Sequence, residues 1–483
     1  MPAQSKFNPL AAFALALGLF LGLAILKFGN PVILDQKIIP PETLADYLTS
    51  FWPTHWAAWI GLPFAVVGWG LICRYQLFRA APPARRGGDM EAKPLVSQTW
   101  LLWLLPLVWL GWQMISSTTS VDHSLTASTL PQFAGCVVVY LLGFCLMNRP
   151  PLMRWLLAGI LAAFTVCLME AVDQRLYEFP INHQNLEDGE KSQWTNLPPS
   201  MVLELKKENI IVTTNGMDIA NPAIMAKFAK GRVYGTLVYP NALAGIILLL
   251  LPAAIAIAFN DTKKLKPFIR GAVIALTMGL GAVAFVFTGS KLGWLLAVAA
   301  GGLMLFRLNW PTRWKWLALA MVLTVGLGSF AVRFHHYFAA GATSAGARLD
   351  YWRAAVQTAR DYPVLGTGPG TFQKPYARLK SPEAEMARLT HNDYLEQFCD
   401  SGLIGGLTYL AWIALALTTI GRRIWVRGDY LSVALFIGLL AWFVQGLGEF
   451  SLYIPALAWT AFTLLGCLAG LPANEFDKNP AKR

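Results

Sequence analysis

Charged residues are scarce in this sequence: they make up 14% of its 483 residues, against about 25% in an average soluble domain. A water-soluble chain of this length would expose too much apolar surface. The apolar residues form near-continuous runs, at 10–26, 56–73, 243–259 and 403–420, and do not alternate with polar ones. Each run approaches the roughly 20 residues that a helix needs to cross about 30 Å of hydrocarbon. Because backbone groups in lipid must bond internally, the sequence predicts an all-α polytopic membrane protein.

Cysteine is also scarce, and the six cysteines show neither a disulfide framework nor a Cys/His zinc spacing. Five of them lie in apolar runs, and only Cys399 lies near a segment outside the membrane. The acidic residues form no clear metal-binding set, since Asp350, Asp393 and Glu396 are scattered and can each pair with a local cation. We therefore expect no metal site and no cofactor.

Twelve apolar segments are predicted to span the membrane. The first is interpreted as a retained span, because it is too long for the core of a signal peptide and no small-residue cleavage site follows it. The segments are 10–27, 56–73, 97–115, 132–147, 154–170, 239–259, 271–288, 290–306, 314–332, 403–420, 430–446 and 452–471.

Two long polar segments, 173–238 and 333–402, interrupt the series of spans. Both are far longer than the usual 2–8 residues between packed helices, and long loops on a rigid scaffold are where function concentrates. The chain therefore divides into 1–172 with spans one to five, the loop 173–238, 239–332 with spans six to nine, the catalytic loop 333–402, 403–471 with spans ten to twelve, and the tail 472–483.

Short basic connectors at 74–93, 263–270, 307–315 and 422–427 set the predicted orientation. Under the positive-inside rule they face the cytoplasm, which puts both termini in the cytoplasm and both long segments on the outer side. The net charge of +12 is then mostly a consequence of topology, and nucleic acid is not an expected partner.

The second long segment contains a histidine in a suggestive position. A helix is expected over 349–359, followed by a break at Pro363, a glycine-rich run at 366–370 and a new helix near Thr390. Thr390 and Asp393 fit a capping box, which would put His391 in the first helical turn. A helix N-terminus favours anions and disfavours imidazolium, so a neutral His391 beside a bound anion suits a general base. A purely structural histidine fits the same spacing.

Cations gather on the same outer side. Arg232 precedes the sixth span, Lys291 lies in the 288–291 hairpin, and Arg348 lies in the second long segment. Each alone is explained by snorkelling, an interfacial position or a solvated helix face, and Asn241 could simply cap its helix. Together the cations suit the phosphate or pyrophosphate of a lipid carrier. The glycine-rich run lacks the Lys-Ser/Thr ending of a nucleotide-binding loop, so an ordinary turn explains it as well.

Four short motifs, in a fixed order relative to the spans, carry a family resemblance. They are Arg232 and Gly235 with Pro240 and Asn241; the 288–291 hairpin; Arg348 and Trp352 leading into 363–372; and His391, Asn392, Tyr394 and Leu395 followed by Gly402 and Gly405. Over roughly residues 230–415 the chain resembles the O-antigen ligase and polymerase superfamily, which shares the domain called Wzy_C.

The resemblance implies a GT-C-like fold and a metal-independent, inverting transfer of a glycan from an undecaprenyl-pyrophosphate carrier, on the periplasmic face of the bacterial inner membrane. Arg232 and Arg348 would hold the pyrophosphate, and His391 would activate the acceptor hydroxyl. The remaining residues assigned to substrate binding are Lys291, Asn241, Asn392, Tyr394 and Gly368. The family usually has Ser-Arg in the hairpin, and here Ser290 is followed by Lys291, which keeps the charge and loses the bidentate fork.

The acceptor could be lipid A-core, another glycan or a protein hydroxyl, corresponding to a ligase, a polymerase or a protein O-oligosaccharyltransferase. We favour O-antigen ligation to lipid A-core. A twelve-span transporter is the competing class, but the span interiors hold almost no ionisable residues, where transporters place their binding sites. A structural membrane protein without catalysis is a third interpretation. In every case the lipid bilayer is a partner.

Overall fold

The structure, a computed structural model, describes residues 8–76, 100–308, 310–339 and 343–472. These residues are nearly all helical, and they include several long apolar helices, so the prediction of an all-α multi-pass membrane protein is confirmed. Most of the first basic connector (77–93) and of the tail (473–483) lie outside the described residues.

Each of the twelve predicted spans falls on one helix. Among the described residues, nine helices are long and apolar enough to cross a membrane, and two more apolar helices, α17 and α18, are shorter. The count of twelve therefore stays a prediction. The twelve helices are α1 (Pro9–Lys27), α3 (Thr54–Gln76), α4 (Leu101–Ser116), α5 (His123–Leu146), α6 (Pro150–Asp173), α10 (Pro240–Asp261), α11 (Pro267–Thr288), α12 (Lys291–Arg307), α13 (Thr312–Ala339), α16 (Asp393–Arg427), α17 (Tyr430–Gln445) and α18 (Pro455–Ala469).

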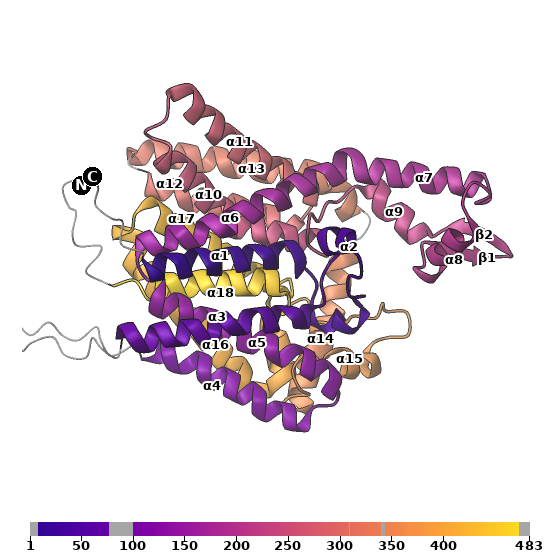
Figure 1. Ribbon diagram of the computed structural model, residues 1–483, viewed down its shortest axis with the longest axis horizontal. Helices are drawn as coiled ribbons and strands as arrows, with labels where there is room; N and C mark the ends of the chain where they lie inside the picture. The colour runs from indigo at the N-terminus through magenta and orange to yellow at the C-terminus, as the bar shows by residue number, and fades with distance from the viewer. Residues whose placement is uncertain (1–7, 77–99, 309, 340–342, 473–483) are drawn as a thin grey trace, which may run out of the picture.

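The helices run roughly side by side, with α1, α18 and α17 near the middle of the bundle (Figure 1). Every residue of α18 is buried. Small residues let α1 and α6 approach closely: a Cβ on Gly18 would lie 2.1 Å from the carbonyl oxygen of Leu156. The α11–α13 flank instead exposes large apolar side chains, such as Phe268 at 87% and Val332 at 74%. This flank suits contact with lipid.

The basic connectors meet at one end of the bundle, here called the basic end. Arg307 donates to the Gly428 carbonyl oxygen at 2.7 Å, and Arg423 donates to the Ala469 carbonyl oxygen at 3.3 Å. The first bond joins the end of α12 to the α16–α17 connector, and the second joins α16 to the end of α18. Lys291, which begins α12, lies at the opposite end from Arg307, which ends it. We call this opposite end the cavity end.

The first long segment forms an arm that projects from the cavity end (Figure 1). Helix α6 continues through a π-helical turn (Gln174–Glu178) into α7 (Phe179–Lys191), so that Pro150–Lys191 is one helical stretch of 42 residues. Helices α8 (Pro199–Lys207) and α9 (Pro222–Lys230) flank a hairpin of β1 (Ile211–Thr214) and β2 (Met217–Ala220). The strands pair antiparallel with Ile211 opposite Ala220, and both residues join a small core with Leu186 and Trp194.

The second long segment is mostly helical as well. Helix α13 continues to Ala339, and α14 (Thr343–Asp361) and α15 (Gln373–Leu379) follow. Helix α16 contains two non-helical residues, Ser401 and Gly402, close to where the tenth apolar segment begins. Short helices complete the structure: η1 (Val32–Lys37), α2 (Leu44–Thr49), η4 (Ser117–Thr119) and η6 (Ser451–Tyr453).

Candidate active site

A cavity of about 740 Å³ lies at the cavity end, between the helix termini and α14. Five of the residues predicted from sequence line it together: Arg232, Asn241, Lys291, Arg348 and His391. They come from the segment before α10, the start of α10, the start of α12, α14 and the segment before α16. Residues separated by up to 159 positions in the sequence thus share one site.

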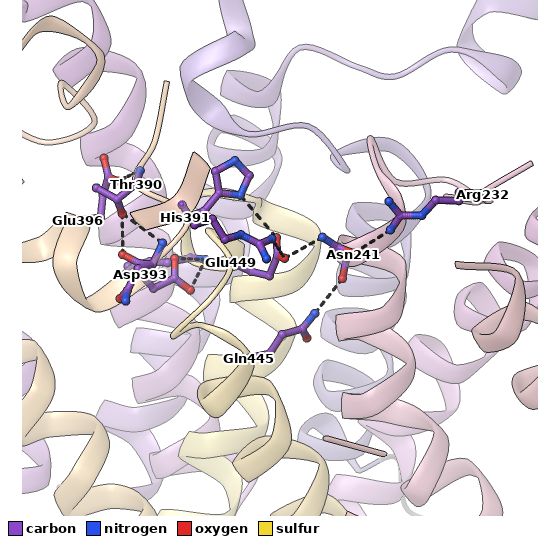
Figure 2. A network of polar contacts seen from close by, with 11 residues as sticks. Arg232, Asn241, Thr390, His391, Asp393, Glu396, Gln445 and Glu449 are labelled. Atoms are coloured by element: carbon purple, nitrogen blue, oxygen red, sulfur yellow. Dashed lines mark hydrogen bonds and ion pairs between the residues drawn. The ribbon is translucent and has the colours of Figure 1, made fainter. Parts of the chain in front are cut away.

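Arg232 is fixed by two hydrogen bonds. Its Nε donates to the Thr288 carbonyl oxygen at 2.8 Å. Its Nη2 donates to Asn241 Oδ1 at 3.0 Å, as Figure 2 shows. Burial lowers the pKa of the Arg232 guanidinium; the carboxylate of Glu449 opposes that shift, and the cation of Arg348 adds to it. A bound anion would offset the free-energy cost of keeping this cation partly desolvated.

Lys291 begins α12, directly after the N-cap residue Ser290, whose Oγ accepts from Gly293 N at 3.2 Å. A cation is disfavoured at a helix N-terminus. Its Nζ lies 3.9 Å from the centre of the Tyr337 ring and 5.5 Å from that of Phe334, which are cation–π distances. No acidic side chain of the described residues forms a salt bridge with it. The ammonium group therefore keeps donors for a ligand.

Glu449 is the central acidic residue of the site, and sequence reasoning missed it. Its side chain is 2% exposed, and its Oε1 accepts from Arg348 Nη2 at 2.6 Å and from Asn241 Nδ2 at 2.7 Å (Figure 2). One carboxylate oxygen thus connects Arg348 to Asn241, and Asn241 in turn holds Arg232. The signal in the sequence was an isolated acid in the short connector between α17 and α18.

The second oxygen of Glu449 faces His391. Oε2 lies 3.9 Å from His391 Nδ1, too far for a hydrogen bond, and neither atom has a hydrogen-bond partner among the described residues. The imidazole ring stacks on Tyr351 and meets the Phe450 ring edge-on, with centroids 5.9 and 4.7 Å away. The ring is held between two aromatic side chains, with Nδ1 directed at a carboxylate.

The predicted capping box is wrong. Asn392 is the N-cap of α16, because its Oδ1 accepts from Tyr394 N at 3.1 Å and from Leu395 N at 3.0 Å. His391 therefore precedes the helix, and its φ of +53° is a left-handed conformation that is uncommon for residues other than glycine. Thr390 does not cap the helix; its backbone N–H donates to Glu396 Oε2 at 2.6 Å.

Asp393 ties the histidine segment to the glutamate segment. Its backbone N–H donates to the carbonyl oxygens of Gly446 and Glu449, at 2.7 and 3.0 Å, and its carboxylate accepts from Leu452 N at 3.1 Å. These bonds join the start of α16 to the α17–α18 connector. They fix the distance between the His391 ring and the Glu449 carboxylate.

The structure does not bring Asn392, Tyr394 and Gly368 to the cavity. Asn392 caps α16, Tyr394 donates its hydroxyl to the Phe443 carbonyl oxygen at 2.9 Å, and Gly368 N donates to the Asp400 carbonyl oxygen at 2.9 Å. A Cβ on Gly368 would lie 2.3 Å from Ser120 Oγ, so the glycine-rich run packs against the α4–α5 connection. The assignment of Asn392, Tyr394 and Gly368 to substrate binding stays a prediction.

The site therefore has two chemical halves. Arg232, Lys291 and Arg348 supply three cations, and the single buried acid among the lining residues is Glu449. Three further acids line the cavity: Glu383 and Glu385 are exposed on the loop before His391, and the half-buried Asp350 pairs with Arg353. The buried part can bind a polyanion, and the imidazole with its facing carboxylate can accept a proton.

Comparison with known families gives one match. Residues 274–410 match the family model described as O-antigen ligase, Wzy_C, so this stretch is similar to the O-antigen ligase superfamily. The resemblance predicted from the four motifs is thereby confirmed, and the family implies an enzyme of the glycosyl-transfer type. The matched residues include Lys291, Arg348 and His391, whereas Arg232, Asn241 and Glu449 lie outside them. No match was found among curated proteins.

Proposed function

We propose that the protein transfers a glycan from an undecaprenyl-pyrophosphate carrier to an acceptor hydroxyl, in the cavity lined by Arg232, Lys291, Arg348, His391 and Glu449. The observation that carries the proposal is the meeting of three cations with a His–Glu pair at one end of a membrane-spanning bundle. A cationic pocket at this position suits a phosphate group whose lipid tail stays in the bilayer.

The cations bind the pyrophosphate. A guanidinium has five N–H donors, and the two hydrogen bonds of Arg232 leave the others available. Arg348 adds a second planar guanidinium, and Lys291 adds a compact ammonium group. As the glycosyl–oxygen bond breaks, negative charge grows on the leaving phosphate oxygen, where these fixed cations stabilise it. Because the protein supplies this charge itself, we propose a metal-independent transfer.

His391 acts as the base. With Nδ1 directed at Glu449, its Nε2 is left to take the proton of the acceptor hydroxyl. The acceptor oxygen forms its bond to the anomeric carbon from the face opposite the pyrophosphate, which inverts the configuration. The bonding electrons leave with undecaprenyl pyrophosphate, the second product. Glu449 orients the ring and stabilises the imidazolium; catalytic hydrogen bonds are often long before substrate binds.

We propose lipid A-core as the acceptor, since O-antigen ligase is the description of the matching family model. Another glycan or a protein hydroxyl would define a polymerase or a protein O-oligosaccharyltransferase of the same superfamily. We further propose a bacterial inner-membrane location, a GT-C-like fold, cytoplasmic termini and a periplasmic cavity. The basic end supports this orientation, because Arg307 and Arg423 meet there.

The test is transfer by the purified full chain in lipid nanodiscs. Undecaprenyl-pyrophosphate glycan is supplied with lipid A-core, short glycan or peptide, and mass spectrometry identifies which acceptor gains mass. We expect glycosylated lipid A-core and free undecaprenyl pyrophosphate in equal amounts. We expect His391→Ala to lower turnover by about 10²–10⁴-fold, the usual contribution of a general base. Absence of transfer to all three acceptors would contradict the proposal.

A further inference from the structure

The arm contains a second cavity, of about 730 Å³, between α7 and α9. One wall is a face of the continuous helix that carries Glu178, the last residue of the π-helical turn, and Asn182 and Asn185 of α7; these are three or four residues apart and so neighbours on the helix surface. The other wall comes mainly from α9, with Ile224, Lys227 and Phe228. A row of hydrogen-bonding side chains thus faces a largely apolar surface.

An indole ring closes the cavity toward the tip of the arm. Gln193 and Trp194 both have positive φ, +50° and +63°, and Trp194 Nε1 donates to the Asp218 carbonyl oxygen at 2.9 Å. The ring lies over Gly189, where a Cβ would come within 2.4 Å of it. Two consecutive residues in this conformation persist only where surrounding contacts enforce it, and such strain gathers at ligand sites.

The chemistry of this cavity differs from that of the active site. Its charged and amide lining consists of three amides, two carboxylates and one lysine, namely Asn182, Asn185, Asn196, Glu178, Asp188 and Lys227. Lys227 lies 4.5 Å from the Tyr234 ring centre. Amides offer both donors and acceptors, carboxylates accept, and a sugar hydroxyl can bond to each. The two carboxylates outnumber the lysine, so the cavity fits a ligand rich in hydroxyl groups, not a pyrophosphate.

One short segment connects the linings of the two cavities, although no residue lines both. Arg232 lines the active-site cavity and Tyr234, two residues later, lines the arm cavity. Gln174 at the α6–α7 junction fixes this segment, because its Oε1 accepts from the backbone N–H groups of Tyr234 and Gly235 at 3.1 and 2.9 Å. The arm cavity is therefore next in sequence to a residue of the active-site cavity, and a ligand longer than the arm cavity could extend toward it.

We propose that the arm cavity binds a carbohydrate chain of several sugar units, laid along α7 and leading to the active site. The polar residues of α7 recur about once per turn, a rise of about 5.4 Å, which is comparable to the length of one pyranose unit in a chain. The inference rests on the proposed function and names the part of the protein that holds the glycan. The chain belongs either to the donor or to a glycan acceptor.

A binding experiment tests the cavity directly. The full chain in nanodiscs is titrated with water-soluble glycan released by mild acid from the membranes of the producing cells, with dextran as the comparison sugar. We expect saturable binding of the released glycan, weakened at least tenfold in Asn182→Ala/Asn185→Ala. Gln184→Ala, an exposed amide on the same helix outside the cavity, should bind as the native chain does. Equal binding by the double variant, or no saturable binding by the native chain, overturns the inference.

Transfer kinetics then separate the two possible sources of the chain and the two proposals. In the double variant, KM should rise with kcat unchanged, for the donor if the donor glycan occupies the arm and for the acceptor if the acceptor does. Unchanged KM for both substrates refutes the role of the arm. His391→Ala should bind the released glycan normally and transfer it about 10²–10⁴-fold more slowly. Failure of transfer in the native chain would overturn the proposed function and leave the binding result standing.

Discussion

His391 shows how much of the candidate site depends on a single backbone conformation. Its φ of +53° turns the chain just before α16, and the hydrogen bonds of Asp393 to the α17–α18 connector hold the turn in place. Left-handed conformations outside glycine cost roughly 1–3 kcal/mol and persist only where the surroundings enforce them. The folded chain therefore keeps a backbone conformation that costs free energy of folding, and this conformation directs the imidazole at Glu449.

Glu449→Gln tests the pairing at the residue scale. Glutamine keeps the shape and can still accept from Asn241, but it removes the charge that would stabilise an imidazolium. We expect kcat to fall about 10²-fold, measured as initial transfer rate at saturating donor and acceptor. Glu42→Gln, an exposed acid of the η1–α2 segment, is the matched control and should transfer normally. Unchanged kcat in Glu449→Gln would show that the charge of this carboxylate has no role in the transfer.

At the scale of elements, the break in α16 joins two parts of the site region. Gly402 has φ +65° and ψ −164°, and a Cβ there would lie 2.4 Å from the Val364 carbonyl oxygen. The break brings the start of the tenth apolar segment against the loop that follows α14. The Leu403 backbone N–H donates to the Pro363 carbonyl oxygen at 2.8 Å.

Gly402→Ala should therefore destabilise the protein, by roughly 1–3 kcal/mol from backbone strain, with the clash adding to it. The measurement is the thermal unfolding midpoint in detergent. Gly111→Ala is the control, because Gly111 lies inside α4, a Cβ there would meet no atom within 4 Å, and alanine favours a helix over glycine. Equal midpoints for Gly402→Ala and the native chain would show that the break is not required.

At the scale of the whole molecule, the membrane topology decides on which side of the membrane the cavity opens. Reporter fusions after residues 200 and 380 should be active on the periplasmic side, and fusions after residues 264 and 428 on the cytoplasmic side. The first pair lies in the arm and in the loop that carries Lys380. The second pair lies in the basic connectors that flank α11 and α17. A cytoplasmic signal at 200 or 380 would reverse the proposed orientation.

Much of this fold was predictable, because membrane spans require long apolar runs and all twelve runs became helices. The clustering of Arg232, Lys291, Arg348 and His391 was also predictable, because all four lie next to span ends or in a loop on the same predicted side of the membrane. The polar stretch 174–191 was expected as loop and forms helix, in which Phe179 and Leu186 are the large apolar side chains that are buried. Glu449 was missed because its importance comes from contacts with residues over 100 positions away.

The continuous helix Pro150–Lys191 has a mechanical consequence. Its 42 residues measure about 63 Å at 1.5 Å per residue, roughly twice the hydrocarbon thickness of a bilayer. Transmembrane helices adjust their tilt to the thickness of the surrounding lipid. For a rigid rod of this length, a tilt of about 5° displaces the far end by about 5 Å. A change in the tilt of the bundle with lipid thickness therefore shifts the far end of the arm relative to the membrane surface.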